Sequence, residues 1–131
     1  MLCMDSDDLT EEDSLLGEMN TIIVEGDDIQ RKRLLSRIIV LLFTSTPFAG
    51  NFVKAGGISL LILATRDPLE KVRLHSVHAL CRLADLGYGR EISSAGAEKD
   101  LNRICSDPYR PLRELAGQCL SRISGPERID N

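Results

Sequence analysis

The 131-residue sequence contains no Trp, and aromatic residues make up only 4% of it. Aliphatic side chains must therefore fill the interior, which favours packed helices. No apolar run reaches the roughly 20 residues of a membrane-spanning helix, and the acidic start is unlike a secretory signal. The four cysteines lack CxxC spacing, which argues against a zinc ribbon or a redox motif. We expect a cytoplasmic protein with reduced thiols, and the nucleus is the alternative location.

Positive charge is missing from the first 30 residues, which hold ten acidic residues and no Lys or Arg. The rest of the chain carries 16 basic and 10 acidic residues. This asymmetry fits a solvated acidic leader or a groove that prefers acidic ligands. The densest basic cluster, Arg31 to Arg33 with Arg37, has no aromatic platform beside it. It predicts a solvated helix start and not a nucleic-acid or membrane site.

An internal repeat of 40 residues determines the predicted architecture. Short patterns recur in one register, and a weaker third copy precedes them, in which Gly17, Asp27, Arg33 and Ser36 fall under residues 57, 67, 73 and 76. The recurring pairs are Ala55-Gly56-Gly57 with Ala95-Gly96-Ala97, Asp67-Pro68 with Asp107-Pro108, Arg73 with Arg113, Leu80 with Leu120, and Arg82 with Arg122.

Each copy is predicted to form two short helices and one long helix. In the second copy, Gly56-Gly57 allows a sharp turn, and Asp67-Pro68 supplies a cap and a first helical residue. Apolar residues three and four apart along 69–86 place one face of that helix in the core. The predicted helices are 11–16, 18–25 and 29–46, then 48–55, 58–66 and 69–86, then 90–95, 98–106 and 109–124, with Thr10 and Asp13 resembling a capping box.

This order of elements resembles the armadillo repeat, and HEAT repeats are the second choice because they lack the separate first helix and its glycine pair. The segments that carry the resemblance are NFVKAGGISLLILATRDPLEKVRLHSVHALCRLADLG and REISSAGAEKDLNRICSDPYRPLRELAGQCLSRISG. It implies an all-α, right-handed superhelix, an armadillo-type solenoid whose long helices line a concave groove for a partner peptide or helix. We expect repeats at 10–46, 47–86 and 87–125, a leader at 1–9 and a tail at 126–131.

Helical spacing places one stripe of each long helix opposite its apolar face, where the groove would lie. The stripe in the second copy is His75, His78, Arg82 and Asp85, and in the third it includes Gln118 and Arg122. Guanidinium groups there favour an acidic or mixed partner segment, although both arginines could instead be solvated or bonded to a neighbouring helix. The first copy offers Leu35, Ile38 and Leu42, either an apolar partner site or a surface that the chain itself covers.

No motif in the sequence indicates catalysis, a cofactor or a metal. His75, His78 and Cys81 share a helix but diverge around it, and Gly87-Tyr88-Gly89 lacks the preceding strand of a nucleotide loop. Arg73 and Arg113 are expected to bind helix carbonyls or an acid within the stack. The leading prediction is a non-enzymatic protein-binding adaptor. The competing prediction is a structural or self-associating fragment of a longer solenoid that pairs through its ends.

Overall fold

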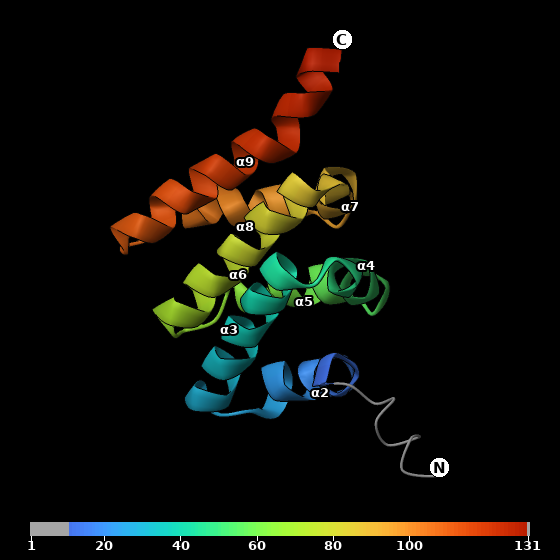
Figure 1. The fold of residues 1–131 in the computed structure, drawn as a ribbon. Helices are drawn as coiled ribbons and strands as arrows, with labels where there is room; N and C mark the ends of the chain where they lie inside the picture. The colour runs from blue at the N-terminus through green and yellow to red at the C-terminus, as the bar shows by residue number, and fades with distance from the viewer. Residues whose placement is uncertain (1–10, 131) are drawn as a thin grey trace.

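The computed structural model describes residues 11–130, with side chains from Glu12 to Ile123, and contains only helices over that range. This confirms the predicted all-α class (Figure 1). In chain order the helices are α2 (Glu11–Glu25), α3 (Asp28–Thr44), α4 (Thr46–Lys54), α5 (Gly57–Ala64), α6 (Glu70–Leu83), the π-helical segment η1 (Ala84–Tyr88), α7 (Gly89–Ser94), α8 (Ala97–Ile104) and α9 (Arg110–Asp130).

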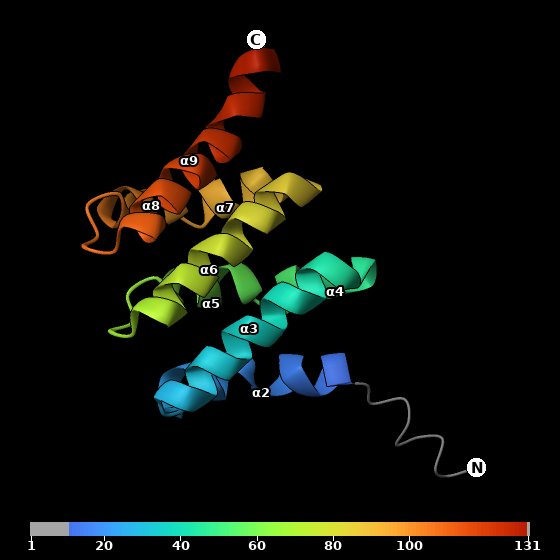
Figure 2. The same cartoon turned by 60° about the vertical axis from the view of Figure 1, so that its left-hand side comes forward.

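The long helices α3, α6 and α9 lie side by side in that order, as both ribbon views show (Figures 1 and 2). The α6 helix has the two most extensive contacts of the fold, one with α3 and one with α9. Each long helix also packs on the short helix that precedes it, because α2 contacts α3, α5 contacts α6, and α8 contacts α9. Helix pairs therefore form three successive layers, and each layer covers part of the next.

The predicted breaks lie where helices end and begin. Gly56 and Gly96 have φ values of 89° and 84°, in the left-handed region that glycine adopts without steric cost. Asp67 and Asp107 each accept a backbone N–H two residues later, at 2.9 and 3.0 Å, just before α6 and α9 begin. The N-cap of α6 is Leu69, so the prediction that Asp67 caps this helix and Pro68 is its first residue is wrong. Asp27 caps α3 directly through a reciprocal capping box with Gln30.

Three predicted boundaries are wrong. A single α2 helix spans 11–25 without a break at Gly17. Burial of Leu15, Met19 and Ile23 holds both halves of this helix against the core and outweighs the roughly 1 kcal/mol by which a glycine destabilises a helix. The α6 helix ends at Leu83, and η1 follows it, with Gly87 at a φ of 102° inside η1. The α9 helix continues to residue 130, past its predicted end at 124. The predicted leader and Thr10 lie outside the described residues.

One continuous hydrophobic core runs through all three layers, from Leu15 to Ile123. Leu35, Ile38 and Leu42 belong to it, since their exposed fractions are 0, 0 and 2%. The predicted apolar partner site at these residues is therefore wrong. The alternative, in which the chain itself covers them, agrees with their burial.

Ion pairs join each layer to the next at the starts of the long helices. Arg73 donates from Nε to Asp107 Oδ2 at 2.9 Å and from Nη1 to the carbonyls of Asp67 and Pro68. Arg31 makes the equivalent bond to Asp67 Oδ2 at 2.6 Å. The predicted structural role of Arg73 is thus confirmed, whereas the first-layer counterpart is Arg31 and not the expected residue 33.

Two further side chains complete these connections. Arg113 binds the carbonyls of Asp107 and Pro108, as predicted, and makes no ion pair with any described residue. In the turn after α5, Arg66 Nε donates to Asp100 Oδ1 on α8 at 2.9 Å, and this hydrogen bond is the main cause of a lowered Asp100 pKa. Ion pairs, in addition to apolar packing, therefore hold the layers in their relative positions.

Among the described helices, none is long and apolar enough by itself to span a membrane, although α4 and α5, bent by 83° at their break, reach that composition when counted together.

Candidate protein-binding surface

An exposed aromatic side chain lies at the junction of α3 and α6. Phe43 is 50% exposed, although it is a large apolar residue. The Arg82 guanidinium lies 4.4 Å from the centre of its ring, and the His78 ring centre is 5.6 Å away at a tilt of 55°. Arg82 Nε also donates to the carbonyl of Leu42 at 3.2 Å. These contacts hold the phenyl ring in place while leaving half of it open to solvent.

A second cluster lies at the junction of α6 and α9. Arg122 Nη1 donates to Asp85 Oδ2 at 3.2 Å and to Cys81 Sγ at 2.6 Å. The Arg122 and Asp85 side chains are 45 and 44% exposed, whereas Cys81 is buried beneath them. A hydrogen bond with Cys119 is the largest influence on the Cys81 thiol, and together with the Arg122 charge it lowers the Cys81 pKa to about 7. The surface here carries a charge pair above two buried sulfur atoms.

The structure brings together most of the residues that the sequence placed on the groove. His78 and Arg82 meet Phe43, and Arg122 meets Asp85. The possibility that both arginines bond to the neighbouring helix is confirmed for each of them. His75 is half-buried, and burial is the first cause of its lowered pKa. Gln118 is exposed and makes no hydrogen bond within the described part of the chain.

The groove positions of the first layer were assigned incorrectly because the helices begin differently. Asp27 is itself the N-cap of α3, whereas Asp67 stands two residues before Leu69, the N-cap of α6. Positions inside these two helices therefore correspond at a spacing of 42 residues, as Arg31 and Arg73 do. At that spacing the counterparts of residues 75, 78 and 82 are Arg33, Ser36 and Val40, and all three are exposed.

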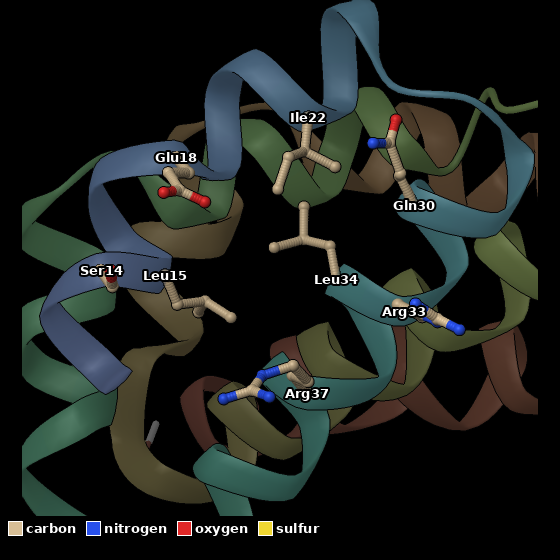
Figure 3. A pocket seen from close by; sticks show the side chains of 8 residues that line it. All are labelled: Ser14, Leu15, Glu18, Ile22, Gln30, Arg33, Leu34 and Arg37. Atoms are coloured by element: carbon tan, nitrogen blue, oxygen red, sulfur yellow. The ribbon is translucent and has the colours of Figure 1, made fainter. Parts of the chain in front are cut away.

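A pocket of about 290 Å³ lies between α2 and α3, and it was not predicted from the sequence. Leu15, Ile22 and Leu34 point into it, as Figure 3 shows. The polar side chains around it include Glu18 and Arg37. Its lining residues belong to the first layer, whose helix α2 lies at the opposite end of the stack from α9 (Figure 1). It is separate from the Phe43 and Arg122 clusters.

Within the described residues, no group of three His, Cys, Asp or Glu side chains is placed to hold a metal ion. His78 instead faces the Phe43 ring, and Cys81 faces Arg122. We therefore define the candidate surface by five residues that lie along the junctions of the long helices: Phe43, His78, Arg82, Asp85 and Arg122.

Comparison with known proteins does not add a functional assignment. A scan against protein-family models finds no match to the chain. A search of curated proteins finds no significantly similar sequence.

Proposed function

We propose that this chain is a protein-interaction module built as a short armadillo-like solenoid of three repeats. Support comes from the three successive layers, from the side-by-side long helices, and from glycine turns at equivalent places in the second and third layers. Units of this kind bury their apolar faces only against neighbours, which leaves an extended surface for binding. In a right-handed superhelix the edge formed by α3, α6 and α9 would line the concave side.

The observation that carries the proposal is the exposed Phe43 ring beneath the Arg82 guanidinium. Aromatic and arginine side chains dominate the energetic centres of protein interfaces, because they offer large contact areas and several hydrogen bonds. Arg82 uses only Nε towards Leu42, and neither Nη group has a hydrogen bond within the described chain. A partner segment with one apolar and one acidic side chain could therefore contact the ring and the guanidinium together.

Arg122 extends the same surface towards α9. Its Nη1 atom is shared between the exposed Asp85 and the buried thiol below, so its second Nη group remains available to a ligand. Asp85 lowers the net positive charge at this end of the surface. We therefore infer a mixed peptide or helix, whose acidic residue lies near Arg82, as the partner.

A display library of random peptides, selected against the folded protein, tests this proposal directly. We expect enriched sequences that combine an acidic residue with an apolar one. Phe43→Ser and the double charge reversal Arg82→Glu plus Arg122→Glu should each weaken their binding at least about tenfold, which corresponds to about 1.4 kcal/mol. Calorimetric titration of a selected peptide measures the change.

The matched control reverses two charges on short helices, Lys54→Glu plus Arg90→Glu, and should leave the affinity unchanged. Both residues are exposed, and they lie on α4 and α7, away from the long-helix junctions. Far-UV circular dichroism confirms that each variant is folded. Equal losses in the control and in the Arg82 and Arg122 variant, or peptides that bind all variants equally, would refute the surface assignment.

Association through the far end of the stack is less well supported. In the last layer Ile123 is only 3% exposed, and Leu115 and Leu120 are half-buried against the core. Stacking of further repeats on this face would need exposed apolar area, and none of the large exposed apolar side chains within 12–123 lies beyond Leu86. A binding module is therefore better supported than association through this face.

A further inference from the structure

Two thiols from different layers meet beneath the surface between α6 and α9. Cys81 lies on α6 and Cys119 on α9, and they are 2 and 0% exposed. They are 38 positions apart in the sequence, but α6 and α9 pack against each other, and Arg122, one turn beyond Cys119 on α9, contacts Cys81 Sγ at 2.6 Å. Both are free thiols in the structure. Absence of a CxxC motif therefore does not exclude a dithiol, because helix stacking brings the two sulfur atoms together.

The surroundings of Cys81 differ from those of an ordinary buried thiol. Arg122 Nη1 donates a hydrogen bond to Cys81 Sγ at 2.6 Å, so a positive charge directly contacts the sulfur atom. Such contact stabilises the thiolate, which is the nucleophilic form of cysteine. Arg122 is itself 45% exposed, so the side chain that contacts the Cys81 sulfur atom also reaches solvent. Cys119 has no such cation hydrogen-bonded to its sulfur within the described chain.

We propose that Cys81 and Cys119 form a peroxide-reactive dithiol, in which Cys81 is the attacking residue and Cys119 the resolving residue. The Cys81 thiolate attacks one oxygen of hydrogen peroxide and the O–O bond breaks. Hydroxide leaves and is protonated to water, and Cys81 becomes a sulfenic acid. The Cys119 sulfur then attacks the Cys81 sulfur, and the S–O bond breaks. The departing hydroxide takes the Cys119 proton and leaves as a second water.

The overall change converts one peroxide into two waters and removes two hydrogen atoms from the protein. Its product is a disulfide that joins α6 to α9 and therefore ties the second layer covalently to the third. Cys81 no longer carries a thiolate in that product, so Arg122 loses its sulfur partner and retains Asp85. This chemistry stands on the two thiols and Arg122, and it holds whether or not the surface binds a peptide.

The test uses the full chain with Cys3→Ser and Cys105→Ser, so that only the two thiols of interest remain. The folded protein is treated with hydrogen peroxide, and intact mass is followed over time. We expect the mass to fall by two hydrogen atoms and dithiothreitol to reverse this change. Proteolysis under non-reducing conditions should give a fragment in which a disulfide links Cys81 to Cys119. In the same background, Cys119→Ser should stop at a sulfenic acid on Cys81 that dimedone traps.

Substitutions at the surface pair separate activation by Arg122 from simple proximity. Arg122→Gln should slow disulfide formation about threefold or more, because it removes the cation on Cys81. Asp85→Asn, which removes the other partner of Arg122 and leaves the thiolate contact, should not slow it. Circular dichroism before oxidation verifies that both variants are folded.

Three results would overturn the assignment. One is that both thiols of the folded protein stay reduced at a peroxide concentration that oxidises them in the protein unfolded by urea. Another is oxygen addition or cross-linking between chains in place of the internal disulfide. The third is dimedone labelling of Cys119 instead of Cys81, which would reverse the two roles.

Discussion

Gly57 offers a direct test of how the short helices pack in the second layer. A methyl group added at this position would lie less than 3.0 Å from the Phe52 ring. That ring cannot move aside easily, because Phe52 is fully buried and stacks on Phe48 with 5.6 Å between ring centres. Gly57 is therefore required by the neighbouring ring and not by the backbone, since Gly56 is the residue with positive φ in this turn.

The expected effect of Gly57→Ala follows from two opposing contributions. Replacing glycine by alanine in a helix stabilises it by up to about 1 kcal/mol. Forcing an extra methyl group into a closely packed site costs about 1–3 kcal/mol. We expect the clash to prevail, with a net loss of about 1–2 kcal/mol in the free energy of unfolding. For a domain of this size each 1 kcal/mol lowers the melting temperature by about 4 °C.

The third layer supplies the compensating substitution. There Ala97 and Ile92 occupy the positions of Gly57 and Phe52, and both are fully buried. The third layer thus combines Ile92, which is smaller than Phe52, with Ala97, which is larger than Gly57. Phe52→Ile should therefore relieve the cost of Gly57→Ala, so that the two substitutions are coupled by about 1 kcal/mol in a double-mutant cycle.

Urea denaturation followed by far-UV circular dichroism measures all four proteins of this cycle, and an unchanged m-value shows that the unfolded state is comparable. Ala97→Gly is the control at the equivalent turn, and it should lose about 1–2 kcal/mol, because the helix gains a glycine and the core loses a methyl group. A Gly57→Ala protein as stable as the parent, or equally destabilised in both backgrounds, would refute the packing argument.

Two further predictions concern the contacts between layers. Arg73→Leu leaves the buried Asp107 carboxylate without its cation and should lower the free energy of unfolding by about 2–4 kcal/mol in the same urea assay. Arg113→Leu breaks no ion pair among the described residues, so its loss should be smaller by at least about 1 kcal/mol. Equal losses in the two variants would contradict this prediction. The Cys81 pKa, lowered to about 7 chiefly by Cys119, should appear as a thiolate absorbance midpoint near pH 7 that rises when Cys119 is replaced by Ala. Because the pKa of Cys81 is lower in the folded than in the unfolded protein, this thiol stabilises the fold above the unfolded pKa, and that stabilisation is lost as the pH falls through 7. A thiolate midpoint at the ordinary cysteine value would refute the prediction of a lowered pKa.

Local signals in the sequence predicted much of the helical pattern. Glycine at the two equivalent turns and Asp-Pro before α6 and α9 act through their own backbone and side-chain chemistry, so their effects do not depend on distant residues. The structural roles of Arg73 and Arg113 also followed from their recurrence. Gly17 did not behave locally, because burial of the α2 face against the core outweighed its low helix propensity.

The first layer of the candidate surface could not be derived from the repeat spacing alone. Two residues separate Asp67 from the α6 N-cap, whereas Asp27 is the α3 N-cap, and this difference shifts every position of α3 relative to the 40-residue register. Because of this difference, Leu35, Ile38 and Leu42 lie in the core and not on the predicted groove. Phe43 was missed for a related reason, since its contact with Arg82 depends on how the two long helices pack.

Asp67 and Asp107 each bind two parts of the chain at once, the first turn of their own long helix and the arginine of the layer before. The starts of α6 and α9 therefore depend on the preceding layer, which holds their aspartates. Separating the layers would weaken the start of the next helix at the same moment. Unfolding of the chain should consequently be sharper than the sum of three independent helix pairs, and a fragment that lacks the first layer should lose helix content within α6 as well.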